Sequence, residues 1–346
     1  MDALPPLPEW ARVQPGRPRT KLPFSRAWPV VAGVLFGLAV RLLAEARLPF
    51  GLYPMMFSFI VIVPFAVGAV TVYVAERSER RTAGYHFRAG FLANVFLMLG
   101  TLAILLEGLI CAILIVPLLA LIGGLGGLAM GWVCHTMNWP KSSVGAVAIL
   151  PLLMAAVEAP MSLPDRFGSL QHERLIAAAP EQAWKQLMDM PVIRPDEMKD
   201  GWMYRIGVPP PVSGVTRQDG GTLVRHVEMG RGIRFDQVST DLQPARRVRW
   251  TYRFTADSFP PRAMDDHVRI GGRHFDLVDT VYTLEPEGAG TRLKVAMSYR
   301  VSTQFNWYAE PLARWLIGDF ETVALRLYAQ RAEEIARRQQ RGGETT

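Results

Sequence analysis

Charged side chains are almost absent from residues 91–134, where Glu107 is the single charged group in forty-four residues. This shortage excludes a core element of an ordinary soluble domain, because a helix at the surface of such a domain keeps a polar face. As one helix the stretch would measure roughly 66 Å, about twice the hydrocarbon thickness of a bilayer. We therefore expect it to cross a membrane twice, with a turn at Glu107-Gly108.

Cysteine is also scarce. The chain has two, Cys111 and Cys134, both in or at the end of the apolar stretch, so residues 162–346 hold no disulfide framework that would report an oxidising compartment. Residues 162–346 also contain no nucleophile elbow, phosphate loop, CxxC pair or His-Glu-x-x-His motif. The sequence therefore gives no positive sign of an enzyme, and we expect neither a cofactor nor a metal.

Three further apolar stretches, at residues 28–46, 54–75 and 143–158, bring the expected number of transmembrane helices to about five, in a helical domain at residues 28–160. Glycines spaced by four, at Gly33 and Gly37 and again at Gly123, Gly127 and Gly131, predict close helix packing. Glu107 and Glu158 are acids within this region. Each fits either a hydrated helix end or a proton or ligand site.

The positive charges of this half predict its orientation. Nine of its twelve Lys and Arg residues lie before residue 27 or at residues 77–88, on one expected face. That face should be cytoplasmic, so residues 1–27 form a basic cytoplasmic tail of a bacterial inner-membrane protein. With five crossings the C-terminal half is periplasmic; if residues 91–134 cross only once, it is cytoplasmic. The net charge of +7 thus reflects topology and does not indicate nucleic-acid binding.

After a proline- and glycine-containing boundary at residues 160–168, the pattern predicts an α+β domain. Alternating polar and apolar residues predict strands at 172–178, 222–229, 233–240, 247–255, 275–284 and 291–301. Helical spacing predicts a helix at 180–190 and a long one at 308–338, followed by a disordered tail at 339–346. The expected arrangement is a curved antiparallel sheet around the long C-terminal helix, and such a sheet can hold an apolar cavity.

Aromatic residues are frequent on the apolar faces of these elements. They fit either the lining of a ligand cavity or a filled core, and the candidates for the lining are Trp250, Tyr252, Phe254, Tyr282, Tyr299, Trp315 and Phe320.

The segments LIAAAPEQAWKQLMDM and TRLKVAMSYRV, the second leading into the long helix, resemble the START-like helix-grip fold of the SRPBCC superfamily. The resemblance covers residues 168–338, and the superfamily includes polyketide cyclases and lipid-transfer proteins. It implies the helix-grip fold and a hydrophobic ligand, but no shared catalytic set. The membrane half, including Glu-Gly-Leu-Ile-Cys at 107–111, is similar to spans found before such domains in some bacterial membrane proteins.

Residues 257–279 interrupt the strands with a polar loop whose candidate site residues are Asp265, Asp266, His267, Arg269, His274 and Asp276. The loop fits a salt-bridged surface segment in which Arg262 also takes part, a ligand-gating or recognition loop, or a metal or catalytic site. On neighbouring strands Arg225, His226, Glu228, Arg231, Arg234 and Asp236 are typical surface ion pairs. Arg205 and Arg253 are candidates for holding an anionic head group if they turn inward.

These observations favour a membrane-tethered domain that binds a hydrophobic or lipid-like small molecule at the bilayer surface. Its expected partners are the lipid bilayer and that ligand. One alternative is a membrane-bound enzyme of polyketide cyclase-like type that uses the loop at 257–279. The other is an interaction or sensory scaffold in the cell envelope, whose protein partner the sequence does not identify.

Overall fold

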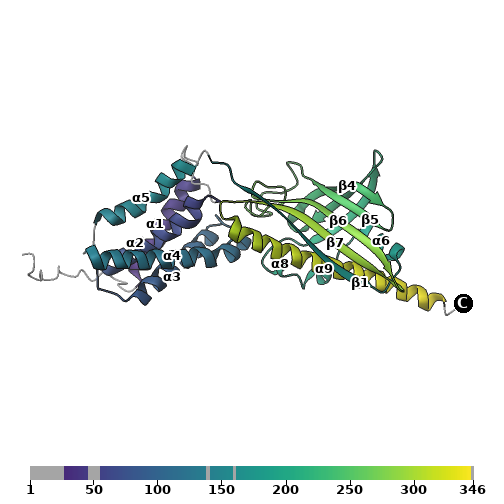
Figure 1. Ribbon diagram of the computed structural model, residues 1–346, viewed down its shortest axis with the longest axis horizontal. Coiled ribbons are helices and arrows are strands. Elements are labelled where there is room, and N and C mark those ends of the chain that lie inside the picture. Colours follow the sequence, from purple (N-terminus) through teal and green to yellow (C-terminus); the bar gives the residue numbers. More distant parts are fainter. Residues whose placement is uncertain (1–26, 46–54, 138–140, 159–160, 344–346) are drawn as a thin grey trace, which may run out of the picture.

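The computed structural model describes residues 27–45, 55–137, 141–158 and 161–343. Two parts lie end to end along the long axis of the molecule (Figure 1). They are a helical bundle at residues 28–158 and a sheet domain at residues 165–343. Apart from Ala27, the basic tail expected at residues 1–27 falls outside the described residues.

The bundle has the following helices: α1 (Trp28–Glu45), the π-helical η2 (Ser58–Ile62) continuing into α2 (Val63–Glu76), α3 (Ala83–Ala103), α4 (Leu109–Met137) and α5 (Lys141–Glu158). Three segments are long and apolar enough to cross a membrane. They are α3, α4, and the continuous helix formed by η2 and α2. The apolar helices α1 and α5 are shorter. The expected number of about five spans is therefore not confirmed. Residues 91–134 are divided between α3 and α4, and the chain reverses at residues 104–108, where the sequence predicts the turn.

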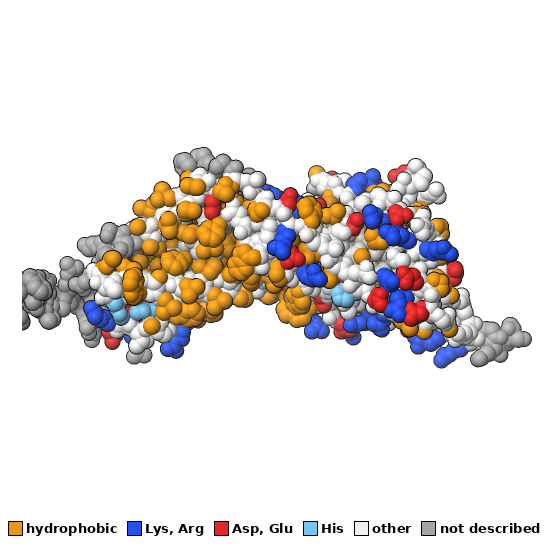
Figure 2. All heavy atoms as spheres, in the orientation of Figure 1, with side chains coloured by type: hydrophobic (Ala, Val, Ile, Leu, Met, Phe, Trp, Pro, Cys, Tyr) orange, Lys and Arg blue, Asp and Glu red, His pale blue; other side chains and the backbone are white. Residues whose placement is uncertain are grey.

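Apolar side chains cover the outside of the bundle. Leu35, Leu121, Leu125, Trp132 and Leu153 are all more than half exposed. Figure 2 shows hydrophobic side chains over the bundle, while charged side chains gather mainly over the sheet domain. Soluble monomers rarely expose contiguous apolar patches of this kind, so the surface is suited to contact with lipid.

Glycines let α2, α3 and α4 approach one another closely. A Cβ on Gly68 would lie 1.9 Å from the carbonyl oxygen of Gly123, and a Cβ on Gly90 would lie 2.2 Å from the same atom. A Cβ on Gly33 would lie 1.9 Å from Thr71 Oγ1, so α1 and α2 are also in tight contact. The predicted packing role is confirmed for Gly33 and Gly123, and Gly68 and Gly90 add close contacts that the sequence did not predict.

The sheet domain contains one seven-stranded antiparallel sheet in the order β1-β7-β6-β5-β4-β3-β2. The strands are β1 (Asp165–Ile176), β2 (Pro211–Asp219), β3 (Thr222–Met229), β4 (Ile233–Gln243), β5 (Arg247–Arg253), β6 (Phe275–Glu287) and β7 (Gly290–Ser302). The long helix α9 (Asn306–Gly343) lies against β1 and β7. Short helices α6 (Pro180–Met188), α7 (Pro195–Met198), α8 (Trp202–Arg205) and η3 (Gly230–Gly232) complete the domain.

The expected antiparallel sheet with a long C-terminal helix is confirmed. Alternation is clear in β7, where Leu293, Val295, Met297 and Tyr299 are buried, and their neighbours between them are more exposed. β2 is an additional strand that the sequence pattern does not predict. The structure also extends α9 to Gly343, so residues 339–343, expected in a disordered tail, are helical.

The start of α9 is built into the bundle. Phe305 packs with Ile60, Met98 and Leu118. Tyr308 donates a hydrogen bond from its hydroxyl to the carbonyl oxygen of Leu114 at 2.6 Å. The sheet domain is therefore joined to the bundle by direct packing and hydrogen bonding as well as by the chain connection at residues 159–164.

Candidate ligand cavity at the domain junction

A cavity of about 300 Å³ lies between the sheet, α9 and the bundle. This volume is at the lower end of the roughly 300–1,000 Å³ usual for small-molecule sites. On the sheet side Val227, Met229 and Phe235 line it, and on the bundle side residues of η2, α3 and α4 do so, among them Phe59, Met98, Ile110, Leu114 and Leu119. The wall of the cavity is therefore shared by both parts of the protein.

One stripe of α9 faces the cavity. Leu312, Leu316, Phe320, Ala324 and Leu327 line it, at spacings of three and four residues that place them on one side of a helix. Ala324 is the smallest side chain of this stripe and is 5% exposed.

Three of the seven aromatic candidates line the cavity: Tyr252, Tyr282 and Phe320. Burial raises the pKa of Tyr252 to about 12, so its phenol stays neutral at physiological pH. Its hydroxyl shares a hydrogen bond of 2.5 Å with Thr280. These two strand tyrosines therefore supply amphipathic surface to a wall that is otherwise apolar.

The other four aromatic candidates do not line the cavity, which corrects the expectation. Trp250 and Tyr299 are completely buried in the core, and the Tyr299 hydroxyl donates to Glu310 at 2.9 Å. Phe254 packs with Phe235 and Phe259 in a separate cluster. Trp315 lies off the cavity stripe of α9 and meets Trp202 at 5.1 Å between ring centroids, with 45% of its surface exposed.

A polar group lies deep in the cavity. Arg225 is 5% exposed, and its guanidinium lies 5.5 Å from the ring centre of Trp250. Within the part of the chain that the structure describes, Arg225 Nε, Gln237 Oε1 and the hydroxyl of Tyr204 are buried without a hydrogen-bond partner. All three residues line the cavity. Buried polar groups are nearly always bonded, so these atoms are suited to a polar part of a ligand.

Arg225 was expected among surface ion pairs, and this prediction is wrong. On β3 it shares its side of the strand with Leu223, Val227 and Met229, which turns it to the interior, while His226 is exposed and pairs with Asp236. Arg205 and Arg253, the arginines proposed for an anionic head group, are both exposed. The cation that faces the interior is therefore Arg225, which was predicted to lie at the solvent-exposed surface.

The loop at 257–279 closes the junction side of the cavity. Asp265 accepts a hydrogen bond from the backbone N–H of Gly108 at 3.0 Å, just before α4. Glu107 pairs with Arg41 at 2.9 Å, and His267 lies 4.0 Å from both Glu107 and Asp265. Glu107, whose side chain is 8% exposed, therefore belongs to a network that joins bundle and loop, and it also lines the cavity.

His267 and His274 both line the cavity, with ring centroids 5.9 Å apart. Burial lowers the pKa of His274 to about 4, and its Nδ1 lies 3.2 Å from the carbonyl oxygen of Ser302, an acceptor. This contact requires the proton on Nδ1 and leaves Nε2 as an acceptor. The other four loop candidates do not line the cavity: Asp265 accepts from Gly108, Asp266 pairs with Arg269 at 3.2 Å, and Asp276 accepts from the N–H of Gly271 at 2.9 Å.

Glu107, Cys111 and Asp265 bring ligand-type atoms within 4.8 Å of one another. Arg41 already neutralises Glu107, and Gly108 holds Asp265, so this group is better suited to joining the two parts than to holding a cation. Glu158 is also satisfied within the protein. Its carboxylate accepts from the N–H of Ser58 at 3.0 Å, where η2 begins, and the residue is 5% exposed.

Residues 168–337 match the model of a family described as polyketide cyclase / dehydrase and lipid transport. The sheet domain belongs to this family. The match confirms the resemblance to the SRPBCC superfamily that the sequence indicates. Among curated proteins, none matches the chain.

Solved structures similar to this domain are distant in sequence. An aromatase/cyclase from Streptomyces sp. R1128 is 15% identical over 49% of this chain and 94% of its own, with a TM-score of 0.30. A point mutant of norcoclaurine synthase from Thalictrum flavum is 12% identical over 50% of this chain and 99% of its own, with a TM-score of 0.32. A protein from Thermus thermophilus is 17% identical over 48% of this chain and 97% of its own, with a TM-score of 0.30.

Proposed function

We propose that this protein takes an amphipathic, lipid-like molecule from the bilayer into the cavity at the domain junction. The apolar part of the molecule lies along α9 and the bundle residues. Its anionic or oxygen-rich group lies at Arg225, with Gln237 opposite on the neighbouring strand. The observation that carries the proposal is the shared wall: Phe59, Met98 and Leu114 of the candidate membrane helices line the same space as Tyr282 and Phe320 of the sheet domain.

The chemistry of the wall supports this kind of ligand. Most of the lining is aliphatic, aromatic or methionine, while Arg225 and Gln237, which face each other on neighbouring strands, each have an unpaired polar atom among the described residues. A fully apolar ligand would leave the guanidinium of Arg225 unsatisfied, and a small polar ligand would leave the α9 stripe uncovered. A molecule with an apolar body and an anionic end satisfies both.

The proposal includes insertion of the bundle in a membrane, with the sheet domain on the side opposite the cytoplasm. Met55, just before η2, accepts a backbone hydrogen bond from Gln304 at the junction. From there α2 leads away from the sheet domain to Arg77, Arg80 and Arg81 (Figure 1). The basic segment and the sheet domain therefore lie at opposite ends of the bundle. Retention of basic residues in the cytoplasm would then place the sheet domain in the periplasm of a Gram-negative cell.

Filling the cavity tests the ligand proposal. Ala324→Phe on α9 adds a ring at a position that lines the cavity, whereas Gln330→Phe adds the same ring at an exposed position of the same helix. Native mass spectrometry of the full chain should show bound dodecanoic acid for the wild type and Gln330→Phe, and little for Ala324→Phe. Equal binding by both variants, with unchanged Tm values, would remove the cavity as the binding site.

Reporter fusions test the orientation. Alkaline phosphatase, which is active only outside the cytoplasm, should be active when fused after residue 346 and inactive when inserted between Arg77 and Arg81. Activity of only the second fusion would reverse the topology. Activity of neither would place both ends of the bundle in the cytoplasm and contradict a spanning bundle.

A second candidate is an enzymatic role, favoured by the placement of His267 and His274 on the cavity wall. Two neighbouring imidazoles are suited to general acid–base chemistry on a bound substrate. Asp266 does not support this role, because 81% of its side chain is exposed and it pairs with Arg269. The enzymatic hypothesis predicts that His267→Gln leaves dodecanoate binding unchanged and abolishes conversion of a polyketide-type substrate; any substrate that the wild type and His267→Gln convert equally fast would count against it.

A further inference from the structure

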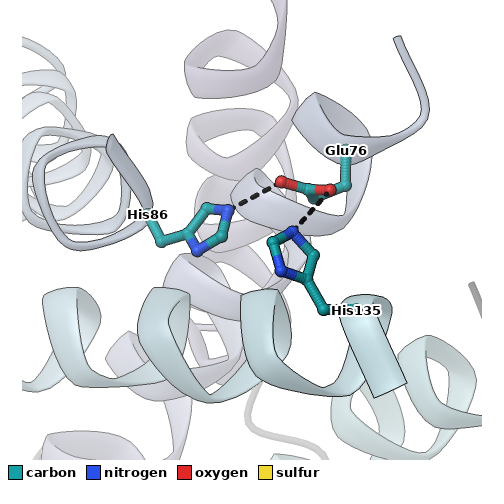
Figure 3. A group of neighbouring side chains, drawn as sticks. All are labelled: Glu76, His86 and His135. Atoms are coloured by element: carbon teal, nitrogen blue, oxygen red, sulfur yellow. Dashed lines mark hydrogen bonds and ion pairs between the residues drawn. The ribbon is translucent and has the colours of Figure 1, made fainter. Parts of the chain in front are cut away.

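Three side chains with metal-ligand chemistry meet at the end of the bundle opposite the cavity. Glu76 is the last residue of α2, His86 lies in the first turn of α3, and His135 lies in the last turn of α4. Figure 3 shows the carboxylate of Glu76 between the two imidazoles, each directed toward one of its oxygens. The group is far from the ligand cavity and contributes nothing to it.

The distances are compatible with one shared ion. His135 Nε2 lies 3.4 Å from Glu76 Oε2, and His86 Nε2 lies 2.7 Å from Glu76 Oε1. One ligand atom from each residue can be chosen so that all lie within 4.8 Å of one another. A tetrahedral zinc ion with bonds of about 2.0–2.2 Å needs ligand atoms roughly 3.3 Å apart. The His135 pair already has this spacing, and the His86 pair requires a small opening.

The electrostatics of the site also call for a cation. Glu76 is 1% exposed, and in the described part of the chain its Oε2 accepts no hydrogen bond, although Oε1 accepts from the backbone N–H of Arg81 at 2.8 Å. The guanidinium of Arg81 lies instead against Glu79 and the ring of Tyr85. A buried carboxylate with an unsatisfied oxygen, facing two imidazoles, needs a positive charge to offset its desolvation.

The packing around the site makes room for the imidazoles. A Cβ on Gly131 would lie 2.1 Å from His86 Nδ1, and a Cβ on Gly127 would lie 2.3 Å from the carbonyl oxygen of His86. The glycines of α4 are thus what allows His86 to reach Glu76. His135, in contrast, has 40% of its side chain exposed, so the group opens toward solvent and an ion can enter.

We propose that Glu76, His86 and His135 bind one divalent transition-metal ion, with Zn²⁺ as the ion that their chemistry fits best. Two imidazoles and one carboxylate, with a further position open to water, form a donor set that zinc accepts. Binding of the ion replaces the hydrogen bond between His86 Nε2 and Glu76 Oε1. Because its ligands come from α2, α3 and α4, the ion links three helices at the end of the bundle remote from the cavity.

The test uses the full chain in detergent, produced without a polyhistidine tag and stripped of metal with EDTA. Titration calorimetry with Zn²⁺ should give one site per chain. Zn²⁺ should also raise the Tm. Co²⁺ should bind at the same site and give the visible absorption bands of a low-symmetry site. A wild-type protein that binds no Zn²⁺ at one site per chain overturns the proposal and leaves a hydrogen-bonded Glu-His pair.

Variants identify the ligands. The decisive variant is His135→Ala, because the side chain of His135 is partly exposed and its removal should leave the fold intact. His86→Ala and Glu76→Gln test the two buried ligands. Each should weaken Zn²⁺ binding at least about 10-fold, the loss that follows even from removing an outer-sphere partner. The matched control is His226→Ala, which breaks an exposed His-carboxylate pair of the same 2.7 Å length that has no third ligand. Zn²⁺ binding unchanged in His135→Ala, or lost equally in His226→Ala, would overturn the assignment.

Discussion

Replacing Arg225 by methionine should separate ligand affinity from stability. Arg225 is 5% exposed, and its guanidinium contacts the face of Trp250 at 5.5 Å. Its Nε is buried without a hydrogen-bond partner among the described residues. If Arg225 serves to bind a ligand, the ligand-free protein bears the desolvation cost of the guanidinium without enough hydrogen bonds to offset it. Methionine keeps a similar length and apolar stem but removes the charge.

The two effects of Arg225→Met have opposite signs. Loss of the contact with Trp250 costs about 0.5–2 kcal/mol. Removing an incompletely paired buried charge recovers several kcal/mol of desolvation penalty. The Tm of the ligand-free protein should therefore stay the same or rise. Removing one partner of a buried charge pair costs about 2–5 kcal/mol of binding, which is about 30- to 4,000-fold in Kd.

The assay compares dodecanoic acid with dodecanol, an uncharged molecule of similar size, on the full chain in phosphatidylcholine nanodiscs. The Kd of dodecanoic acid should rise at least about 30-fold in Arg225→Met, whereas the Kd of dodecanol should change little. Arg253→Met removes an exposed cation of the sheet and should change neither value. Equal losses for acid and alcohol, together with a lower Tm, would mean that Arg225 is a structural residue, and the proposed head-group site would be wrong.

Three other predictions concern the fold and the junction. Burial lowers the pKa of His274 from about 6.5 to about 4, so the unfolded chain binds this proton first as the pH falls. The stability present above pH 6.5 is therefore lost on acidification toward pH 4. His274→Gln should flatten this part of the plot of Tm against pH. Gly68→Ala places a Cβ 1.9 Å from the Gly123 carbonyl and should destabilise the bundle by about 1–3 kcal/mol in thermal melts, whereas Gly145→Ala, with nothing within 4 Å, should be neutral or stabilising. Asp265→Ala removes the acceptor for the Gly108 N–H and should lower the free energy of unfolding by about 0.5–2 kcal/mol. It should also speed hydrogen exchange at residues 257–279 and 104–108. Unchanged exchange there would mean that the loop does not hold the two parts together.

The elements of the sheet domain could be predicted well where alternation was strong. β3 occupies residues 222–229, as expected, and β7 and α9 begin within a few residues of their predicted starts. β2 was missed because Pro209, Pro210 and Pro211 precede a segment rich in polar residues, which is typical of a loop. Its partner β3 and the backbone pairing of Met190 with Gly214 hold it in the sheet, and such long-range pairing leaves no local pattern.

The cavity could be predicted only in part, for a related reason. A period of two places Trp250 and Tyr252 on one face of β5, but it does not tell how deep each lies: Trp250 is sealed in the core, while Tyr252 reaches the cavity. The same period places Arg225 on the inner face of β3 with Val227 and Met229. The alternation therefore indicated an inward-facing Arg225. The prediction nevertheless placed it at the surface, because a charged residue on a strand usually faces solvent.

The bundle side of the cavity left no pattern at all. Phe59, Met98 and Leu114 belong to helices that are apolar all round, so lipid-facing, helix-facing and cavity-facing positions have the same composition. What distinguishes them is contact with another part of the chain: Phe305 and Tyr308 at the start of α9 reach these helices and fix the sheet domain on them. A hydrophobic ligand that leaves the bilayer at this point need not cross water, because the wall that receives it is made partly of the helices that would stand in the lipid.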